Sequence, residues 1–250
     1  MTIEAHSALA PFYAGRPPYA PVFFEQAARK LGLSAESVLM DLCCGRGELS
    51  AGFAGRCKSI YAVDGSREML DHRIPQPNVE FLLYDVNKDV VDLPQPVDHI
   101  VIGSAIHWIE PASLGRLIER NLKPGGKVLV THTLMNLQQQ PWYPALAKLD
   151  ASYGKDGAGA KSFKDLEGAD RLKACGFARV DKLRAAGSIT VTASYLYKMQ
   201  LSYLYSGFRE QVSQDLEGYR RKLVETVKPY LDAEGKLRAE LVNWGVVFGR

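Results

Sequence analysis

The sequence lacks the features that mark several large classes of protein. None of the apolar runs in its 250 residues is long enough to cross a bilayer. Residues 1–6 show neither the basic stretch nor the apolar stretch of a signal peptide. Internal repeats and low-complexity tracts are also absent. We therefore expect a cytoplasmic protein that spans no membrane, folded as a single domain over residues 1–250.

Cysteine is scarce, and its spacing excludes two kinds of cross-link. The four cysteines are Cys43, Cys44, Cys57 and Cys175, which form no disulfide framework. Adjacent cysteines are a poor ligand pair for one structural zinc, which usually takes two cysteines separated by two to four residues. The sequence therefore predicts free thiols in the core or in turns, in keeping with a reducing cytosol, and no metal site.

Charge of one sign is not in excess either. The net charge is +3, and the basic residues are scattered, with their densest run at 220–222 in a segment with helical spacing. A solvated helix face explains that run better than an RNA-binding site does. We therefore expect no nucleic-acid partner. The composition, 46% hydrophobic and 24% charged, is ordinary for a globular domain of this length.

Short apolar runs alternate with helical segments over the first half of the chain. Strands are expected at 38–42, 59–63, 79–83, 98–103 and 127–131, and helices at 21–31, 48–54, 67–72 and 111–121. Buried strands joined by helices indicate a parallel sheet with right-handed crossovers. The expected fold class is therefore α/β, a Rossmann-like three-layer sandwich.

The rhythm changes after residue 134. Helices are expected up to about residue 153, at 166–175 and at 210–227, with a glycine-rich, mobile stretch at 154–159. Strands at 177–184 and 239–248 are expected beside the fifth strand, which gives a seven-stranded, mostly parallel sheet. Residues 1–32 are interpreted as an N-terminal lid segment, and 134–175 and 194–228 as helical elements on the substrate side.

The most informative stretch is 38–47, where a buried strand ends in Asp41 and a turn follows with Gly45 and Gly47. Strand, glycine turn and helix together are typical of nucleotide-like ligands. A dinucleotide would place its pyrophosphate at the helix N-terminus, and Asp41 would repel it. The carboxylate favours a ligand that is positively charged here. S-adenosylmethionine (SAM) has a sulfonium and an ammonium and no phosphate.

The chain resembles class I SAM-dependent methyltransferases at four places in order. Residues 41–47 are similar to the family's glycine-rich loop, although Cys43 stands at its first glycine. Asp64 ends the second strand, Asp85 follows the third, and 122–128 are similar to the turn into the fifth. The resemblance covers nearly the whole chain. It implies SAM as cofactor and S-adenosylhomocysteine (SAH) as product.

The resemblance also implies roles for individual residues. Asp64 would hold the ribose hydroxyls, Asp85 the adenine amino group, and Asp41 would face the ammonium. The expected cofactor-binding residues are Tyr13, Arg16, Asp41, Cys43, Gly45, Gly47, Asp64, Gly65, Asp85, Val86 and Ser104. Each acid has a plainer reading as a helix cap or a turn-stabilising carboxylate.

Two further segments narrow the resemblance. Residues 13–19 and 104–109 are similar to small-molecule methyltransferases such as the trans-aconitate and the ubiquinone/menaquinone enzymes. The chain also resembles bacterial azapteridine N-methyltransferases of toxoflavin-type biosynthesis. The likeness implies that Arg16 pairs with the SAM carboxylate, for which its forked guanidinium is suited. The alternative is an ordinary surface arginine.

Aromatic residues mark the expected acceptor side. His107 and Trp108 follow the fourth strand and are the candidate catalytic residues, His107 as a base or an orienting group and Trp108 as a stacking surface. The expected substrate-binding residues are Tyr19, His107, Trp108, Trp142, Tyr143 and Tyr203. The alternative for all of them is structural packing, which is the commoner role of buried aromatic residues.

The expected reaction is an in-line methyl transfer to a small, planar heteroaromatic acceptor, with N-methylation favoured. Proximity and alignment dominate, because the sulfonium is already activated. Alternatives are O- or C-methylation of another metabolite, a tRNA methyltransferase, an NAD-dependent oxidoreductase, and a non-catalytic protein with the same fold. The sequence leaves monomer and dimer equally open.

Overall fold

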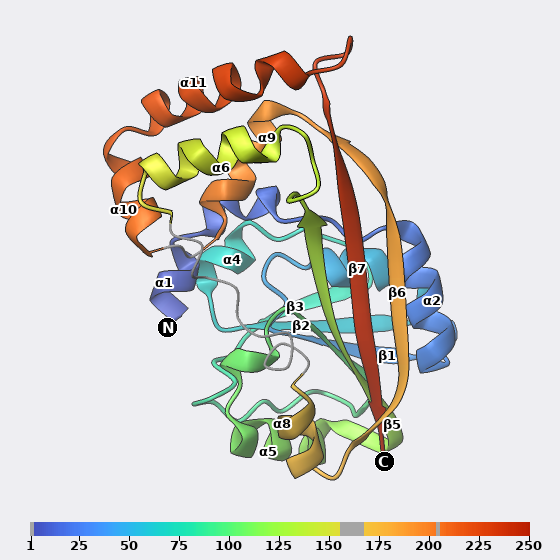
Figure 1. Cartoon of the computed structure of the whole chain (residues 1–250). Coiled ribbons are helices and arrows are strands. Elements are labelled where there is room, and N and C mark those ends of the chain that lie inside the picture. Colours follow the sequence, from blue (N-terminus) through green and yellow to red (C-terminus); the bar gives the residue numbers. More distant parts are fainter. Residues whose placement is uncertain (1–2, 156–167, 204–205) are drawn as a thin grey trace.

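One twisted sheet organises the molecule (Figure 1). The computed structural model describes residues 3–155, 168–203 and 206–250. Its seven strands lie in the order β3-β2-β1-β4-β5-β7-β6. They are β1 (Val38–Leu42), β2 (Ser59–Asp64), β3 (Val79–Leu83), β4 (Val97–Gly103), β5 (Leu122–Asn136), β6 (Ala178–Val191) and β7 (Leu237–Gly249). The first five pair in parallel, and β7 runs antiparallel to both β5 and β6.

The order of the strands locates the functional edge. β1 lies inside the sheet with β2 on one side and β4 on the other. The chain adds strands on one side of β1 up to β3 and then crosses to the other side for β4, so the strand order reverses between β1 and β4. Ligands of open α/β sheets bind at such a switch point, outside the carboxyl ends of the strands. All five residues of β1 are buried, as expected for a central strand with both faces covered. The Rossmann-like α/β prediction is confirmed.

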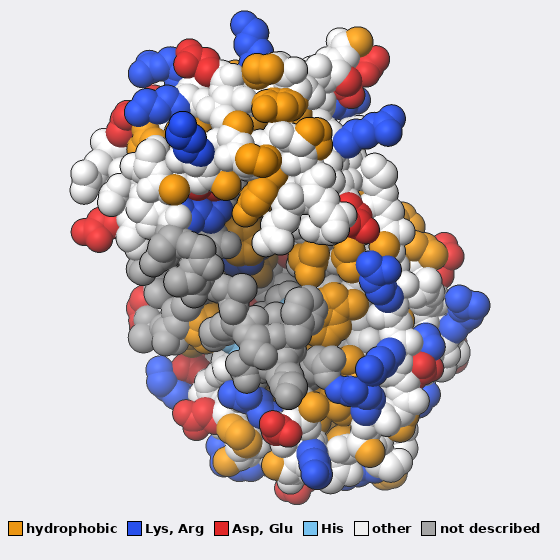
Figure 2. All heavy atoms as spheres, viewed as in Figure 1, with side chains coloured by type: hydrophobic (Ala, Val, Ile, Leu, Met, Phe, Trp, Pro, Cys, Tyr) orange, Lys and Arg blue, Asp and Glu red, His pale blue; other side chains and the backbone are white. Residues whose placement is uncertain are grey.

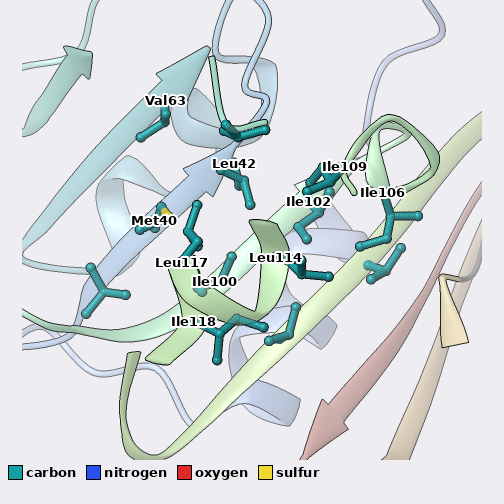
Figure 3. Packing of buried hydrophobic residues seen from close by; sticks show 14 of the residues in the cluster. Met40, Leu42, Val63, Ile100, Ile102, Ile106, Ile109, Leu114, Leu117 and Ile118 are labelled. Carbon is teal, nitrogen blue, oxygen red and sulfur yellow. The ribbon is translucent and has the colours of Figure 1, made fainter. Parts of the chain in front are cut away.

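Helices cover both faces of the sheet. On one face lie α2 (Pro21–Leu31) and α3 (Glu48–Phe53), which contribute aromatic residues such as Phe23 and Phe53 to a shared core. On the other lie α5 (Pro111–Asn121) and α8 (Ala169–Ala174). Figure 3 shows this second core, in which Met40, Leu42, Ile100 and Ile102 of the sheet lie with Leu114, Leu117 and Ile118 of α5.

A separate helical layer stands beyond the carboxyl edge of the sheet (Figure 1). It contains α6 (Tyr143–Ser152), α9 (Ala193–Leu201), α10 (Ser206–Gln214) and α11 (Leu216–Val227). Its own core includes Trp142, Phe208 and Tyr219. The lengths of β5, β6 and β7, which are 15, 14 and 13 residues, let these strands reach from the sheet core to this layer.

Several expected boundaries were wrong. The predicted helix 210–227 is two helices, because Asp215 caps α11 by accepting a hydrogen bond from the Gly218 amide at 2.9 Å. The fifth, sixth and seventh strands are longer than predicted, because their antiparallel pairing continues past the parallel part of the sheet. The segment before residue 21 also forms α1 (Ile3–Ser7) and the 3-10 helix η1 (Ala10–Gly15). Much of 154–159 lies outside the described residues.

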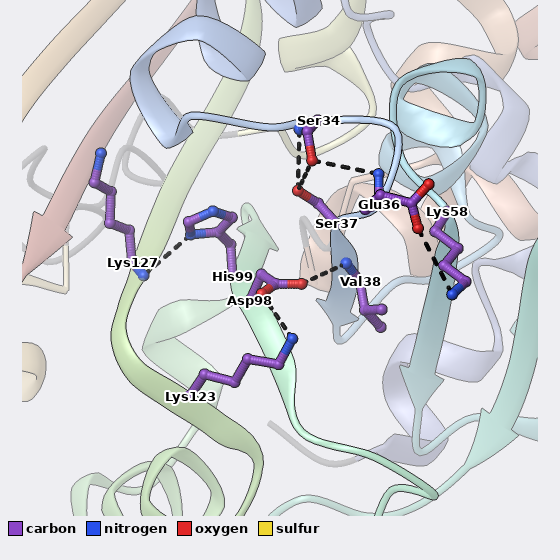
Figure 4. Close-up of polar contacts among 9 residues, drawn as sticks. All are labelled: Ser34, Glu36, Ser37, Val38, Lys58, Asp98, His99, Lys123 and Lys127. Atoms are coloured by element: carbon purple, nitrogen blue, oxygen red, sulfur yellow. Dashed lines mark hydrogen bonds and ion pairs between the residues drawn. The ribbon is translucent and has the colours of Figure 1, made fainter.

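The amino edge of the sheet is held by polar contacts (Figure 4). Asp98 accepts the Val38 amide at 2.7 Å and pairs with Lys123 at 2.8 Å. His99 accepts the Lys127 amide through Nδ1 at 3.2 Å, and burial lowers the pKa of its imidazole to about 4. His99 is therefore neutral at pH 7, and this edge is structural.

The surface shows no concentration of one charge on the face in Figure 2, where basic and acidic side chains are scattered among each other. Among the described residues, no helix combines the length and the apolar composition that crossing a membrane requires. Cys44 and Cys57 are buried thiols, and Cys43 and Cys175 are half-buried.

Candidate functional site

The loop after β1 depends on left-handed backbone conformations. Cys43, Gly45 and Gly47 have φ angles of 57°, 60° and 88°. A Cβ on Gly47 would lie 2.9 Å from the Phe81 ring, so only glycine fits there. Cys43 adopts the same region with a side chain, at a cost of about 1–2 kcal/mol. The loop is thus a strained turn that the surrounding structure holds in place.

Asp41 is the next-to-last residue of β1, just before this turn, and is 1% exposed. Its Oδ2 accepts hydrogen bonds from the Ser50 amide at 3.0 Å and the Ser50 hydroxyl at 2.7 Å. Its Oδ1 is buried and has no hydrogen-bond partner within the described part of the chain. Burial raises the pKa of the Asp41 carboxyl to about 7. A cationic donor from a ligand would satisfy Oδ1 and favour the ionised form.

Asp64 connects the end of β2 to the same turn. Its Oδ2 accepts the Gly45 amide at 2.7 Å and its Oδ1 the Ser66 amide at 2.8 Å. A carboxylate has about four acceptor positions, so Asp64 retains capacity for a ligand hydroxyl beside these amides. Burial raises the pKa of Asp64, although these amides partly oppose that effect. Asp64 therefore contacts the glycine loop, and this position suits both of its expected roles, stabilising the turn and binding a ligand.

Asp85 follows β3 and lies beside the end of β2. A Cβ on Gly65 would be 3.4 Å from the Asp85 Cα, so the two loops are in contact. Asp85 Oδ1 accepts the Asn87 amide at 3.1 Å, and Oδ2 pairs with Lys88 at 3.0 Å. Val86 is buried in the core next to α5. Asp41, Asp64 and Asp85 thus line one sheet edge in strand order.

Arg16 directly follows η1 and lies between two tyrosine rings. Its guanidinium carbon is 5.3 Å from the centroid of Tyr13 and 4.1 Å from that of Tyr203. The Nε is buried and has no hydrogen-bond partner within the described part of the chain. The Arg16 carbonyl accepts the Tyr195 hydroxyl at 3.0 Å, which fastens η1 to α9. The arginine is therefore held in place with an unused donor.

Tyr13 and Tyr19 both lie near the carboxyl edge of the central strands, Tyr13 at Gly45 and Tyr19 at Gly103. The Tyr13 ring would be 3.3 Å from a Cβ on Gly45, and burial raises its pKa to about 12. Tyr19 packs on Phe23 with ring centroids 5.0 Å apart, and its hydroxyl would be 3.2 Å from a Cβ on Gly103. Tyr13 covers the loop, whereas Tyr19 lies largely within the core that α2 covers.

The segment after β4 carries the candidate catalytic residues. Ser104 has a φ of 55°, and its amide donates to the Thr131 carbonyl at 2.8 Å. The 3-10 helix η3 (Ile106–Trp108) follows, in which the His107 and Trp108 rings are 4.8 Å apart. Both side chains are half-buried. They lie at the same sheet edge as the three acids, one strand further along.

Sequence reasoning missed a second histidine–tryptophan pair at this edge. His132 of β5 faces Trp244 of β7 directly across the two strands, with stacked rings 4.7 Å apart. Trp244 and Trp108 both pack against the core that α5 covers. The pairing joins residues far apart in sequence, so only the strand register could reveal it.

Other predicted substrate residues lie elsewhere. Trp142 is 2% exposed in the core of the helical layer, and its indole N–H donates to the Arg238 carbonyl at 3.0 Å. Tyr143 packs against the same core. Tyr203, in contrast, is brought to Arg16. The structure thus joins Tyr203 to Arg16 and places Trp142 among packing residues.

Comparison with known proteins agrees with this geometry. Residues 40–130, which span Asp41, Asp64, Asp85 and His107, match the family model described as a methyltransferase domain. Over this stretch the chain is similar to a methyltransferase domain. The cofactor of such a domain is SAM. The orphaned Asp41 Oδ1 and Arg16 Nε fit the ammonium and the carboxylate of that molecule.

The relatives support the same domain. An uncharacterized methyltransferase of Mycobacterium tuberculosis (strain ATCC 25618 / H37Rv) is 32% identical over 129 residues, which are 51% of each chain. A 2-phytyl-1,4-naphtoquinone methyltransferase of Trichormus variabilis is 31% identical over 142 residues, 49% of this chain and 60% of that one. The chain spans about half the length of the first curated relatives it matches.

A solved structure extends the likeness to the whole fold. It is that of a proposed type II methyltransferase from Anaeromyxobacter dehalogenans, with a TM-score of 0.65 and 15% identity. The match covers 94% of this chain and 97% of that one. The long antiparallel strands and the helical layer therefore belong to the matched fold as well.

Proposed function

We propose that the protein transfers a methyl group from SAM to a small, planar heteroaromatic acceptor, with N-methylation favoured. The observation that carries the proposal is a pair of buried atoms of opposite charge type, Asp41 Oδ1 and Arg16 Nε, that have no hydrogen-bond partner among the described residues. Both adjoin the glycine loop, Asp41 at the end of the strand before it and Arg16 through Tyr13, which covers Gly45. An α-amino acid presents an ammonium, which would donate to Asp41 Oδ1, and a carboxylate, which would accept from Arg16 Nε.

The remaining cofactor residues follow from the order of the acids. Asp64, whose oxygens keep free acceptor positions, would hold the ribose hydroxyls. Asp85 and Val86 would receive the adenine amino group and ring. The loop residues Cys43, Gly45, Gly47 and Gly65, with Ser104, would shape the backbone wall around the ligand.

The acceptor would lie between η3 and the helical layer. His107 and Trp108 lie in η3, just after β4, and the Tyr203 ring lies against the Arg16 guanidinium. Aromatic surfaces favour a flat acceptor. The naphthoquinone substrate named for the relative from Trichormus variabilis is a flat bicyclic ring, which supports a planar acceptor and keeps C-methylation as the alternative. O-methylation of another metabolite is the third possibility.

The chemistry needs alignment more than strong acid–base groups. Bound SAM supplies a methyl group on a sulfonium, which is already a good leaving group. Asp41 and Arg16 fix the amino-acid end, so that the reacting groups are held in line, which can lower the barrier by up to about 7–11 kcal/mol. His107 would accept the proton of an N–H or O–H acceptor, worth about 10²–10⁴ in rate.

Two other functions are weaker. A tRNA methyltransferase would need a basic face, and the visible face shows mixed charges. An NAD-dependent oxidoreductase would place pyrophosphate beside the buried Asp41, which opposes it. Thermal shift separates the ligands, because a ligand at 100 times its dissociation constant adds about 2.7 kcal/mol of stability. SAH should stabilise the protein; stabilisation by NAD alone would contradict the proposal.

The acceptor class can be tested without knowing the acceptor. The protein is incubated with methyl-¹³C-labelled SAM and a cell extract separated by size into small molecules, RNA and protein. We expect label in the small-molecule fraction, at the chemical shift of an N-methyl group on an aromatic ring. Arg16→Met serves as the weakened control. Label confined to RNA or protein would refute a small acceptor, and a C-methyl or O-methyl shift would refute N-methylation alone.

A further inference from the structure

One side chain connects the loop after β3 to the turn that carries His107 and Trp108. The Asn87 side-chain amide donates through Nδ2 to the Trp108 carbonyl at 2.9 Å, and its Oδ1 accepts the Glu110 amide at 2.9 Å. The Asn87 backbone amide donates to Asp85 Oδ1 at 3.1 Å. Asn87 therefore contacts the expected adenine-binding acid through its backbone and the expected acceptor turn through its side chain.

The turn needs such external support. η3 is three residues long, and its hydrogen bonds are those of the Trp108 amide to the Ala105 carbonyl at 2.9 Å and the Ile109 amide to the Ile106 carbonyl at 3.2 Å. So short a 3-10 helix fixes its own orientation poorly. A second element also contacts the turn, because Arg171 of α8 donates to the Ile109 carbonyl at 3.0 Å. Asn87 and Arg171 thus hold the turn from two different elements.

We infer that Asn87 is a positioning residue, which sets the His107–Trp108 turn in register with the adenine-side loop. The inference rests on the proposed function, because it gives the turn its role at the acceptor. An asparagine suits this task, since one rigid planar amide both donates to the Trp108 carbonyl and accepts from the Glu110 amide two residues further along. Through Asn87, the loop after β3 that would hold the adenine also orients His107 and Trp108, which would contact the acceptor. Small displacements of such groups lower the reaction rate by large factors.

The chain offers a matched control in the next residue. Lys88 pairs with Asp85 Oδ2 at 3.0 Å, and its side chain is 79% exposed. Lys88→Ala therefore disturbs the acid without touching the turn. Asn87→Ala removes both contacts to the turn while keeping the backbone contact to Asp85. Asn87→Asp keeps the acceptor for the Glu110 amide and loses the donor to the Trp108 carbonyl.

The test uses fluorine NMR of full-length protein labelled with 5-fluorotryptophan. The chain has three tryptophans, and Trp108→Phe identifies the resonance of Trp108. In ligand-free Asn87→Ala we expect that resonance to shift or broaden, while those of Trp142 and Trp244 stay in place. Asn87→Asp should show an intermediate change and Lys88→Ala none. SAH affinity of Asn87→Ala should stay within about threefold of the wild type.

Each outcome of this experiment supports or overturns the role of Asn87. An unchanged Trp108 resonance in Asn87→Ala overturns the inference, as does an equal change in Lys88→Ala. Equal changes at all three tryptophans would mean a general loss of structure and also overturn it. Failure of the wild type to bind SAH would instead contradict the proposed function, and the ligand-free spectra would still decide the role of Asn87.

Discussion

Replacing Arg16 with methionine separates two effects that usually change together, ligand affinity and folding stability. The guanidinium lies over the Tyr203 ring, and its buried Nε has no hydrogen-bond partner in the described part of the chain. Methionine keeps an unbranched apolar stem between Tyr13 and Tyr203. It gives up a cation–π contact worth about 0.5–2 kcal/mol, and it removes a buried donor whose desolvation costs about 1–3 kcal/mol. These terms oppose each other and differ by less than about 1 kcal/mol at the middle of each range, which is the change expected in the free energy of unfolding.

The affinity effect should be larger. Hydrogen bonds to charged groups contribute about 1.5–3 kcal/mol, and every 1.4 kcal/mol is tenfold in affinity. SAH should therefore bind Arg16→Met about 10- to 150-fold more weakly. Arg16→Lys should fall between, because lysine keeps the charge without the fork. 5′-Methylthioadenosine lacks the amino-acid carboxylate, so its affinity should hardly change.

Calorimetry with both ligands is the assay, and urea unfolding measures stability. Arg29→Met on the exposed face of α2 is the matched control and should leave all values unchanged. Equal weakening of SAH and 5′-methylthioadenosine would show that Arg16 acts through general structure. Unchanged SAH affinity would remove Arg16 from the site.

Three further predictions concern single positions. Asp41→Asn should weaken SAH binding about tenfold or more by calorimetry without lowering stability. In the wild type, the affinity for SAH should fall as the pH drops through about 7, because ligand-free Asp41 gains its proton there, and an affinity that does not change with pH would contradict this. Gly15→Ala would place a Cβ 2.4 Å from the Lys198 carbonyl carbon, so η1 must move away from α9 and the affinity for SAH should fall. Its control is Gly55→Ala, whose Cβ meets nothing within 4 Å and which should leave the affinity for SAH unchanged. The pKa of His99 in the folded protein, about 4, lies below its unfolded value, so the stability that the neutral imidazole contributes is lost as the pH falls from 6.5 towards 4. Between pH 7 and 5, the free energy of unfolding measured in urea should fall by about 2 kcal/mol more in the wild type than in His99→Gln, and an equal fall in both proteins would refute this.

The sequence predicted the parallel half of the sheet closely. The bounds of β1, β3, α2 and α5 match the expectation, because short apolar runs and one-sided helical spacing reflect burial directly. The acids at the strand ends were found for a related reason, since parallel strands place their carboxyl ends at one edge. The break at Asp215 was missed because a capped helix start interrupts the chain without changing its polarity pattern.

The acceptor side was harder to predict. The pairing of His132 with Trp244 depends on strand register, and the link from Asn87 to Trp108 depends on how two loops meet. Neither leaves a local pattern. Trp142 shows that position along the chain is not sufficient either. It lies in the segment expected on the substrate side, but its side chain is buried in the core of the helical layer. Composition identified aromatic residues near the site but not which of them line it.

The most direct test of the central claim is a crystal structure of the protein with SAH bound. We expect the ligand's carboxylate on Arg16, its ammonium at Asp41 Oδ1, its ribose on Asp64, and its sulfur directed at the space beside His107 and Trp108. An amino-acid end bound away from Asp41 and Arg16, or a sulfur enclosed by protein with no space for an acceptor, would contradict the account.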